Sequence, residues 1–223
     1  MTTVSARPLR RDAAENRQRL LDAATEVFAK HGLDGSVEEV ARVAGVGMGT
    51  LYRRFPTKQD LIDTLVGDMR RELAALARAA STATDGTGLE RLLVSAGELQ
   101  AGGRGCLSGL WDHSTAELGA MTTFRSTLRL LLTRAQAAER VRADVVSTDV
   151  WMLLWSLRGV IETTGAVAPN AWRRHLELMI AGLRPVTGPF ATGLGERPLC
   201  EAHARRVTTA RQVSKAGPGP AGR

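Results

Sequence analysis

The residues best suited to reading a nucleic acid lie close together between positions 47 and 58. This stretch combines small, hydroxyl, phenol and basic side chains: Gly47, Met48, Gly49, Thr50, Tyr52, Arg53 and Lys58. Glycine lets a backbone approach its target closely, and hydroxyl and guanidinium groups bond to base edges in the major groove. We therefore predict that Thr50, Tyr52 and Arg53 contact bases directly.

Two short helices joined by a tight turn must position these residues. The stretch from Ser36 to Phe55 reads SVEEVARVAGVGMGTLYRRF. Ser36 followed three residues later by Glu39 is typical of a capping box, and Gly45 is suited to the left-handed turn that ends a first helix. Leu51 and Phe55 then share one face of a second helix. This arrangement predicts a helix-turn-helix over 36–55, although any two short helices joined by glycine have a similar pattern.

The exact residues of two segments resemble those of TetR-family transcriptional regulators. The segments are Val46–Leu61, VGMGTLYRRFPTKQDL, and Arg19–Gly32, RLLDAATEVFAKHG. The resemblance covers about residues 13–73 closely and implies a DNA-binding domain there, with Lys58 and the Ser36 region on phosphates. Gly47 departs from the Ser or Thr that usually caps the recognition helix in this family, at a cost of a few tenths of a kcal/mol.

Composition indicates an ordinary all-α protein. The 223 residues are 43% hydrophobic and 24% charged, with 4% aromatic residues. The start has no apolar signal segment, no run is long enough to span a membrane, and two distant cysteines predict neither a disulfide nor a zinc site. We therefore expect a cytoplasmic protein. The net charge of +7 supports DNA binding only weakly, because residues 185–223, with six basic and two acidic residues, contribute +4 of it.

The pattern along the chain predicts two domains with flexible ends. We expect a flexible basic arm at 1–12 and the DNA-binding domain at 13–73, followed by a loop at 81–88 that ends a long connecting helix. An effector-binding and dimerisation domain is expected at 85–184, and a disordered basic tail at 185–223. The arm could reach DNA, or its charges could simply keep it solvated.

Two groups of apolar residues in the second domain are candidates for binding. Six are candidate effector contacts: Trp111, Met121, Phe124, Leu128, Met152 and Trp155. Six more, on two late apolar helices, are candidate dimer contacts: Trp151, Trp172, Leu176, Met179, Ile180 and Leu183. The resemblance implies a homodimer and a small hydrophobic effector. The alternatives are plain core for the first group and a monomeric core for the second.

No set of residues predicts an enzyme. Cys106 and His113, with Asp112 beside it, lie too far apart along a helix to pair as nucleophile and base. We expect no cofactor and no metal. The sequence thus predicts a dimeric regulator that binds a palindromic DNA operator and is released by its effector. The alternative is a helical ligand-binding or interaction module with only non-specific affinity for DNA.

Overall fold

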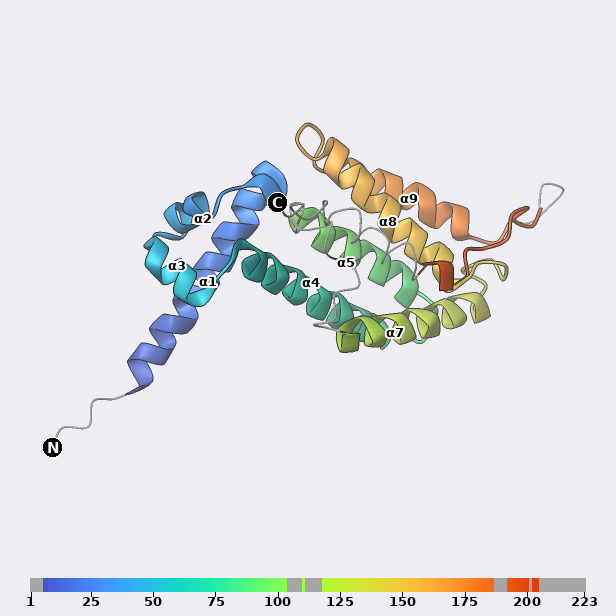
Figure 1. The fold of residues 1–223 in the computed structure, drawn as a ribbon. Coiled ribbons are helices and arrows are strands. Elements are labelled where there is room, and N and C mark those ends of the chain that lie inside the picture. The colour runs from blue at the N-terminus through green and yellow to red at the C-terminus, as the bar shows by residue number, and fades with distance from the viewer. Residues whose placement is uncertain (1–5, 104–109, 111–117, 187–191, 201, 205–223) are drawn as a thin grey trace, which may run out of the picture. The chain divides into compact units, whose positions relative to one another are not determined.

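The described residues fold mainly into helices, as the computed structural model in Figure 1 shows. The structure describes residues 6–103, 110, 118–186, 192–200 and 202–204, without the side chains of 6–14 and 118. Within these residues the elements are α1 (Ala6–His31), η1 (Gly32–Asp34), α2 (Val37–Ala44), α3 (Met48–Arg54), α4 (Lys58–Ala80), α5 (Gly88–Gly102), α7 (Leu118–Ala137), α8 (Ser147–Thr164) and α9 (Ala171–Leu183).

The chain divides into two compact units. Among the described residues the N-terminal unit comprises 6–68 together with Gly103, and the C-terminal unit begins at Met69, so the division falls inside α4. The sequence pattern predicted a later boundary, in the loop at 81–88. The difference arises because Leu73 and Ala77 in the second half of α4 are fully buried and belong to the C-terminal unit.

Three apolar stripes form the core of the N-terminal unit. Leu20, Ala24 and Phe28 of α1 are all 0% exposed, as are Val40 of α2 and Leu51 of α3. The first helix begins at Ala6, so residues 6–12, which we predicted to be a flexible arm, continue the helix instead. A proline at position 8 is compatible with this start, because the first turn of a helix has no carbonyl partner for its N–H groups.

The C-terminal unit is a helix bundle. Helix α5 packs against α7, α8 and α9, and α8 packs along α9. Its core includes side chains that are 0% exposed on each of three helices: Leu92 on α5, Leu128 on α7 and Leu157 on α8. Among the described residues, no helix combines the length and the apolar character needed to cross a membrane.

Helix α8 is capped by Val146, whose N–H donates to the Asp149 carboxylate at 2.9 Å. One side of α8 is open. Met152 is 47% exposed, and Ser156 and Gly159 follow on the same exposed stripe.

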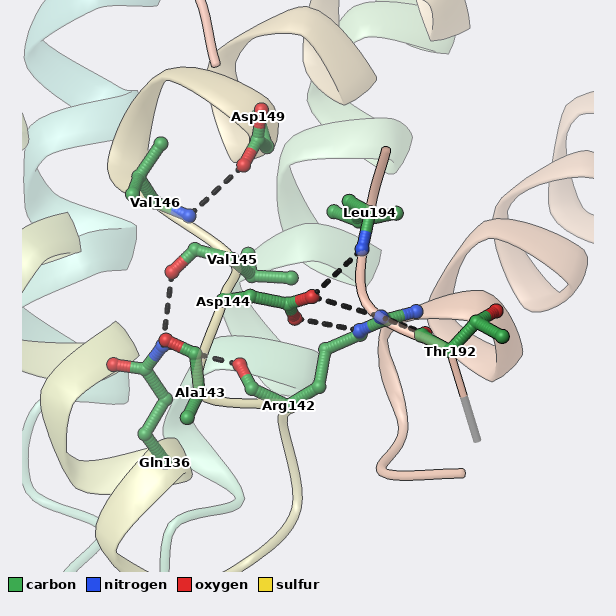
Figure 2. Close-up of polar contacts among 9 residues, drawn as sticks. All are labelled: Gln136, Arg142, Ala143, Asp144, Val145, Val146, Asp149, Thr192 and Leu194. Atoms are coloured by element: carbon green, nitrogen blue, oxygen red, sulfur yellow. Dashed lines mark hydrogen bonds and ion pairs between the residues drawn. The ribbon is translucent and has the colours of Figure 1, made fainter. Parts of the chain in front are cut away.

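Part of the predicted disordered tail is bound to the bundle. Figure 2 shows residues 192–194 beside the turn between α7 and α8. The Arg142 guanidinium makes two bonds to Asp144, at 2.6 and 2.8 Å, and donates to the Thr192 carbonyl at 2.9 Å. The Leu194 N–H donates to Asp144 at 3.0 Å. We call residues 192–194 the strap. Residues 187–191, 201 and 205–223 of the predicted tail lie outside the described residues.

Candidate nucleic-acid interface

Helix α2 begins and ends as its sequence predicts. The Ser36 side chain accepts a bond from the Glu39 N–H at 3.1 Å. Gly45 adopts the left-handed conformation, with φ 65°, and the Val46 N–H bonds back to the Ala41 carbonyl at 3.0 Å. This is the Schellman geometry, which reverses the chain and allows α3 to start three residues later.

The Glu39 carboxylate makes contacts that we did not predict. It lies 3.6 Å from His31 Nε2 and 3.5 Å from the Arg42 guanidinium. The His31 ring at the end of α1 therefore faces α2. Both pairs are partly solvent-exposed and so add little stability, and only the His31–Glu39 pair connects α1 with α2.

Helix α3 is anchored by its apolar side and leaves its other side open. Leu51 is 0% exposed and Phe55 is 3% exposed. On the other side Gly49 and Arg53 are exposed, and Tyr52 is 44% exposed, while Met48 and Thr50 are half-buried. The Tyr52 phenol, the Thr50 hydroxyl and the Arg53 guanidinium have no described protein partner, so their hydrogen-bonding groups are available to a ligand.

The two glycines at the start of α3 leave space in front of it. Gly47 is the N-cap, with extended backbone and no side-chain cap bond. No heavy atom lies within 4 Å of the position that a Cβ would take at Gly47 or Gly49. The wall of a DNA groove could therefore come close to the backbone at these two positions. The missing hydroxyl at position 47 leaves the first N–H groups of α3 without a side-chain acceptor.

The first turn of α4 places Lys58 on the same unit. Thr57 caps α4 by accepting the Asp60 N–H at 3.1 Å, and the Thr57 N–H donates to the Asp60 carboxylate at 2.9 Å. This is a capping box with Asp in place of the usual Glu. The Lys58 ammonium lies 5.8 Å from the centre of the Phe28 ring, a cation–π contact that holds the stem while the charge stays partly exposed.

These observations describe a helix-turn-helix with one open, basic and hydroxyl-bearing side. Two family models match the chain: bacterial regulatory proteins of the tetR family over residues 20–65, and the C-terminal domain of SbtR-like transcriptional regulators over residues 75–185. A solved TetR regulatory protein from Mycobacterium vanbaalenii is 36% identical, with a TM-score of 0.54, over 79% of this chain and 99% of that one. The chain belongs to the TetR family of transcriptional regulators.

Other relatives agree with this assignment. A solved TetR regulator from Streptomyces coelicolor is 30% identical with a TM-score of 0.52, covering 77% of this chain and 99% of that one. An HTH-type transcriptional regulator of Staphylococcus aureus is 46% identical over 54 residues. That match spans 24% of this chain and 29% of the relative. This TetR-family protein is therefore a DNA-binding transcription factor and not an enzyme, as the sequence predicted.

The predicted effector residues of this TetR-family protein do not form one described site. Phe124 and Leu128 are 0% exposed, and Met121 is half-buried. Phe124 and Trp155 pack edge-on against Trp151, with ring centres 5.8 and 6.3 Å away. Met152 differs from these residues, because its side chain is 47% exposed. Trp111 lies outside the described residues.

Half of the predicted dimer residues are buried inside the protomer. Trp151, Trp172 and Leu176 are only 9%, 3% and 2% exposed. Their burial has a local cause in α9, where the Trp172 ring fills the space beside Gly97 of α5. Met179 is 38% exposed, and Ile180 and Leu183 are half-buried. The open side of α9 instead includes Leu178, which is 58% exposed and was not predicted.

A cleft of about 950 Å³ lies at one end of the bundle, where α5 begins and α7 and α9 end. Leu89, Leu93 and Leu183 contribute apolar walls, and the strap residues Thr192 and Gly193 line it as well. None of the five predicted effector residues that the structure describes lines this cleft. The sequence did not predict this cleft, because its walls come from segments about 50 and 100 residues apart. Only Arg142 and Asp144 are close enough in sequence for their pairing to be expected from the sequence alone. Among the described residues, no cluster of side chains could hold a metal ion.

Proposed function

We propose that this TetR-family regulator is a homodimeric, effector-responsive repressor that acts in the cytoplasm on a near-palindromic operator. The observation that supports operator reading best is the orientation of α3. Leu51 and Phe55 are buried, so Tyr52, Arg53 and Gly49 are directed away from the core of the N-terminal unit. A helix anchored in this way can lie in the major groove with its open side on base edges.

Phosphate contacts would come from the helix starts on either side. Ser36 is an exposed N-cap, and its hydroxyl, which accepts the Glu39 N–H, still has a proton to donate. Lys58 lies in the first turn of α4, where its charge opposes the helix dipole. One DNA phosphate could accept the proton of the Ser36 hydroxyl, and another could pair with the Lys58 ammonium and offset its unfavourable position. Met48 and Gly47 would face the groove beside the base-reading residues.

Dimerisation is proposed through the open sides of α8 and α9. These helices pack along each other. Their exposed stripes carry small and apolar residues: Met152, Ser156 and Gly159 on α8, and Leu178, Met179, Ala181 and Gly182 on α9. Small residues allow close approach of helices from a second copy, which would form a four-helix interface. This surface replaces the predicted one that included Trp151, Trp172 and Leu176.

Effector control is the last element of the proposal. A small hydrophobic molecule bound in the C-terminal unit would favour a conformation in which the two α3 helices no longer match successive grooves. Such coupling is typically worth about 1–3 kcal/mol. An effector that binds tightly and leaves operator affinity unchanged would contradict this part.

Selection of binding sites from random duplex DNA tests the proposal as a whole. We expect enrichment of an inverted repeat whose half-sites are about 34–36 Å apart, the spacing that suits two recognition helices on one side of the duplex. Recovery of duplexes with no common sequence, bound only at low salt, would instead support a helical ligand-binding or interaction module with non-specific affinity for DNA.

A further inference from the structure

Every hydrogen bond described for the strap uses its backbone. The Arg142 guanidinium donates to the Thr192 carbonyl at 2.9 Å, and the Leu194 N–H donates to the Asp144 carboxylate at 3.0 Å. Thr192, Gly193 and Leu194 are all exposed, and Leu194 retains 55% of its accessible surface. The strap therefore buries little apolar surface, and its exposed hydrogen bonds add only modest stability.

The pair of Arg142 and Asp144, which we call the clamp, is complementary in charge to the edge of an extended backbone (Figure 2). In an extended chain, the carbonyl of one residue and the N–H of the second residue after it point to the same side. The cation of the clamp faces such a carbonyl and the anion faces such an N–H. Two bonds within the clamp, at 2.6 and 2.8 Å, fix this arrangement. The clamp can therefore bind an extended segment whatever its side chains.

Gly193, between the two bonded strap residues, lines the cleft and leaves it unfilled. The cleft is about 950 Å³ in volume, and its walls include Leu89, Leu93 and Leu183. Among the described atoms, a Cβ at Gly193 would meet only Asp144 Oδ2 within 4 Å, at an ordinary contact distance of 3.8 Å. Asp144 is also a wall of the cleft, so a side chain at this position would start there. The φ angle of Gly193 is not positive, so other residues can adopt its backbone conformation.

We propose that the cleft is a docking site for an extended segment of a partner protein. The clamp would bind the backbone of that segment, and an apolar side chain at the position of Gly193 would enter the cleft. In such docking, main-chain hydrogen bonds give affinity and side-chain pockets give specificity. The strap occupies the clamp when no partner is bound. Because it presents glycine to the apolar walls, a segment with leucine at that position can displace it.

A substitution in the strap tests whether the cleft accepts a side chain. In Gly193→Leu the hydrogen-exchange protection factor of the Leu194 amide should rise by about tenfold or more, the factor expected for burying a leucine side chain. The matched control is Gly195→Leu, because Gly195 is exposed, does not line the cleft and has no described atom near its Cβ position. Both changes stiffen the chain equally. Equal protection in the two variants, or no gain in Gly193→Leu, would overturn the proposal.

A peptide added to the full-length protein tests whether an outside segment can use the site. The probes are two fluorescent peptides with the sequence of residues 189–197, one native and one with leucine at the position of Gly193. By fluorescence anisotropy, the leucine peptide should bind the wild-type protein about tenfold or more tightly than the native peptide does. The protection of the Leu194 amide in the protein, measured by NMR, should fall as this peptide displaces the strap.

The Gly193→Leu protein distinguishes docking in the cleft from binding elsewhere. Its own strap would fill the cleft, so it should bind the leucine peptide about tenfold or more weakly than the wild type does. Equal affinity of the two proteins would overturn the proposal, as would the absence of saturable binding to the wild type at millimolar peptide. The site is separate from operator reading and effector response, so its failure would leave the proposed function intact.

Discussion

The Trp172 ring of α9 occupies the space in which a side chain at position 97 of α5 would lie. Three ring atoms, Cζ3, Cε3 and Cη2, surround the position of the missing Cβ. Trp172 is 3% exposed as a result, and the contact fixes the distance between α5 and α9 in the C-terminal unit. The backbone of Gly97 is not in the left-handed region, so the reason for glycine at this position is close packing and not backbone conformation.

Gly97→Ala should therefore destabilise the protein by about 1–3 kcal/mol, the usual effect of overpacking a core. Chemical denaturation measures it. Gly102→Ala is the control on the same helix, since no atom lies within 4 Å of its Cβ position. That change should be neutral or stabilising by up to about 1 kcal/mol, because alanine favours helix. Equal effects of the two substitutions would contradict the packing described.

The sequence predicted the helix-turn-helix well because its signals are local. The Ser36 cap, the left-handed Gly45 and the buried Leu51 each depend on residues within one or two turns. The dimer face was predicted less well. Helical periodicity identifies Trp172 and Leu176 as one apolar stripe, but it does not say whether another copy or the same chain covers that stripe. Here the Trp172 ring packs against Gly97 of the same chain, about 75 residues earlier.

The contacts of the strap left no trace in its own sequence. The Arg142 guanidinium donates to the Thr192 carbonyl, and the Leu194 N–H donates to the Asp144 carboxylate, so the strap contributes only backbone groups, which almost any residue could supply. Only the partners of the strap, Arg142 and Asp144, are residues whose type indicates an interaction. The tail was therefore assigned to disorder from its Pro and Gly content, and the described residues 192–194 correct that assignment.

Loss of the Arg142 guanidinium should release the strap. In Arg142→Ala the hydrogen-exchange protection of the Leu194 amide should fall toward that of unstructured chain, as measured by NMR. Arg158→Ala is the control, because it removes an ion pair with Glu162 at 2.9 Å on α8 and should leave Leu194 unchanged. Persistent protection in Arg142→Ala would show that the strap is held by other contacts.

The strap should be insensitive to pH over the neutral range. The bond from Arg142, with that from the Leu194 N–H, holds the pKa of Asp144 below its ordinary value of 3.8. A carboxyl with a depressed pKa stabilises the folded state above that ordinary value, and the contribution is lost as pH falls through the depressed pKa. Leu194 protection factors should thus be constant from pH 8 to 5 and fall only in strong acid. A midpoint near neutrality would contradict this role for Asp144.

A bulky charge on the open side of α8 should separate the proposed dimer. Gly159 has no atom within 4 Å of its Cβ position, so Gly159→Arg should fold normally as a protomer. Its dimer dissociation constant should rise by about 100-fold or more, because a charge would be buried in the interface. Sedimentation equilibrium measures this, with Gly119→Arg on α7, which is equally unhindered, as the control. An unchanged dimer would place the interface elsewhere.

Lys58 and Arg53 should affect DNA binding in different ways. Lys58→Ala should weaken binding to all sequences alike and reduce the slope of log K against log salt by about 1, as for one lost phosphate contact. Arg53→Ala should cost about 1–3 kcal/mol mainly on the specific sequence. Fluorescence anisotropy at several salt concentrations separates the two effects. Identical behaviour of both variants would remove the distinction between base and phosphate contacts.

Tyr52 is the only tyrosine in the chain, and its substitution tests most directly whether the open side of α3 reads bases. The DNA is the intergenic duplex upstream of the protein's own gene, carrying a fluorescent label. Its anisotropy is measured with the wild type and with Tyr52→Ala, with a scrambled duplex as competitor. We predict saturable wild-type binding that survives the competitor and weakens in Tyr52→Ala by about tenfold or more. Equal binding of both proteins to both duplexes, lost at higher salt, would contradict the claim and leave only phosphate attraction.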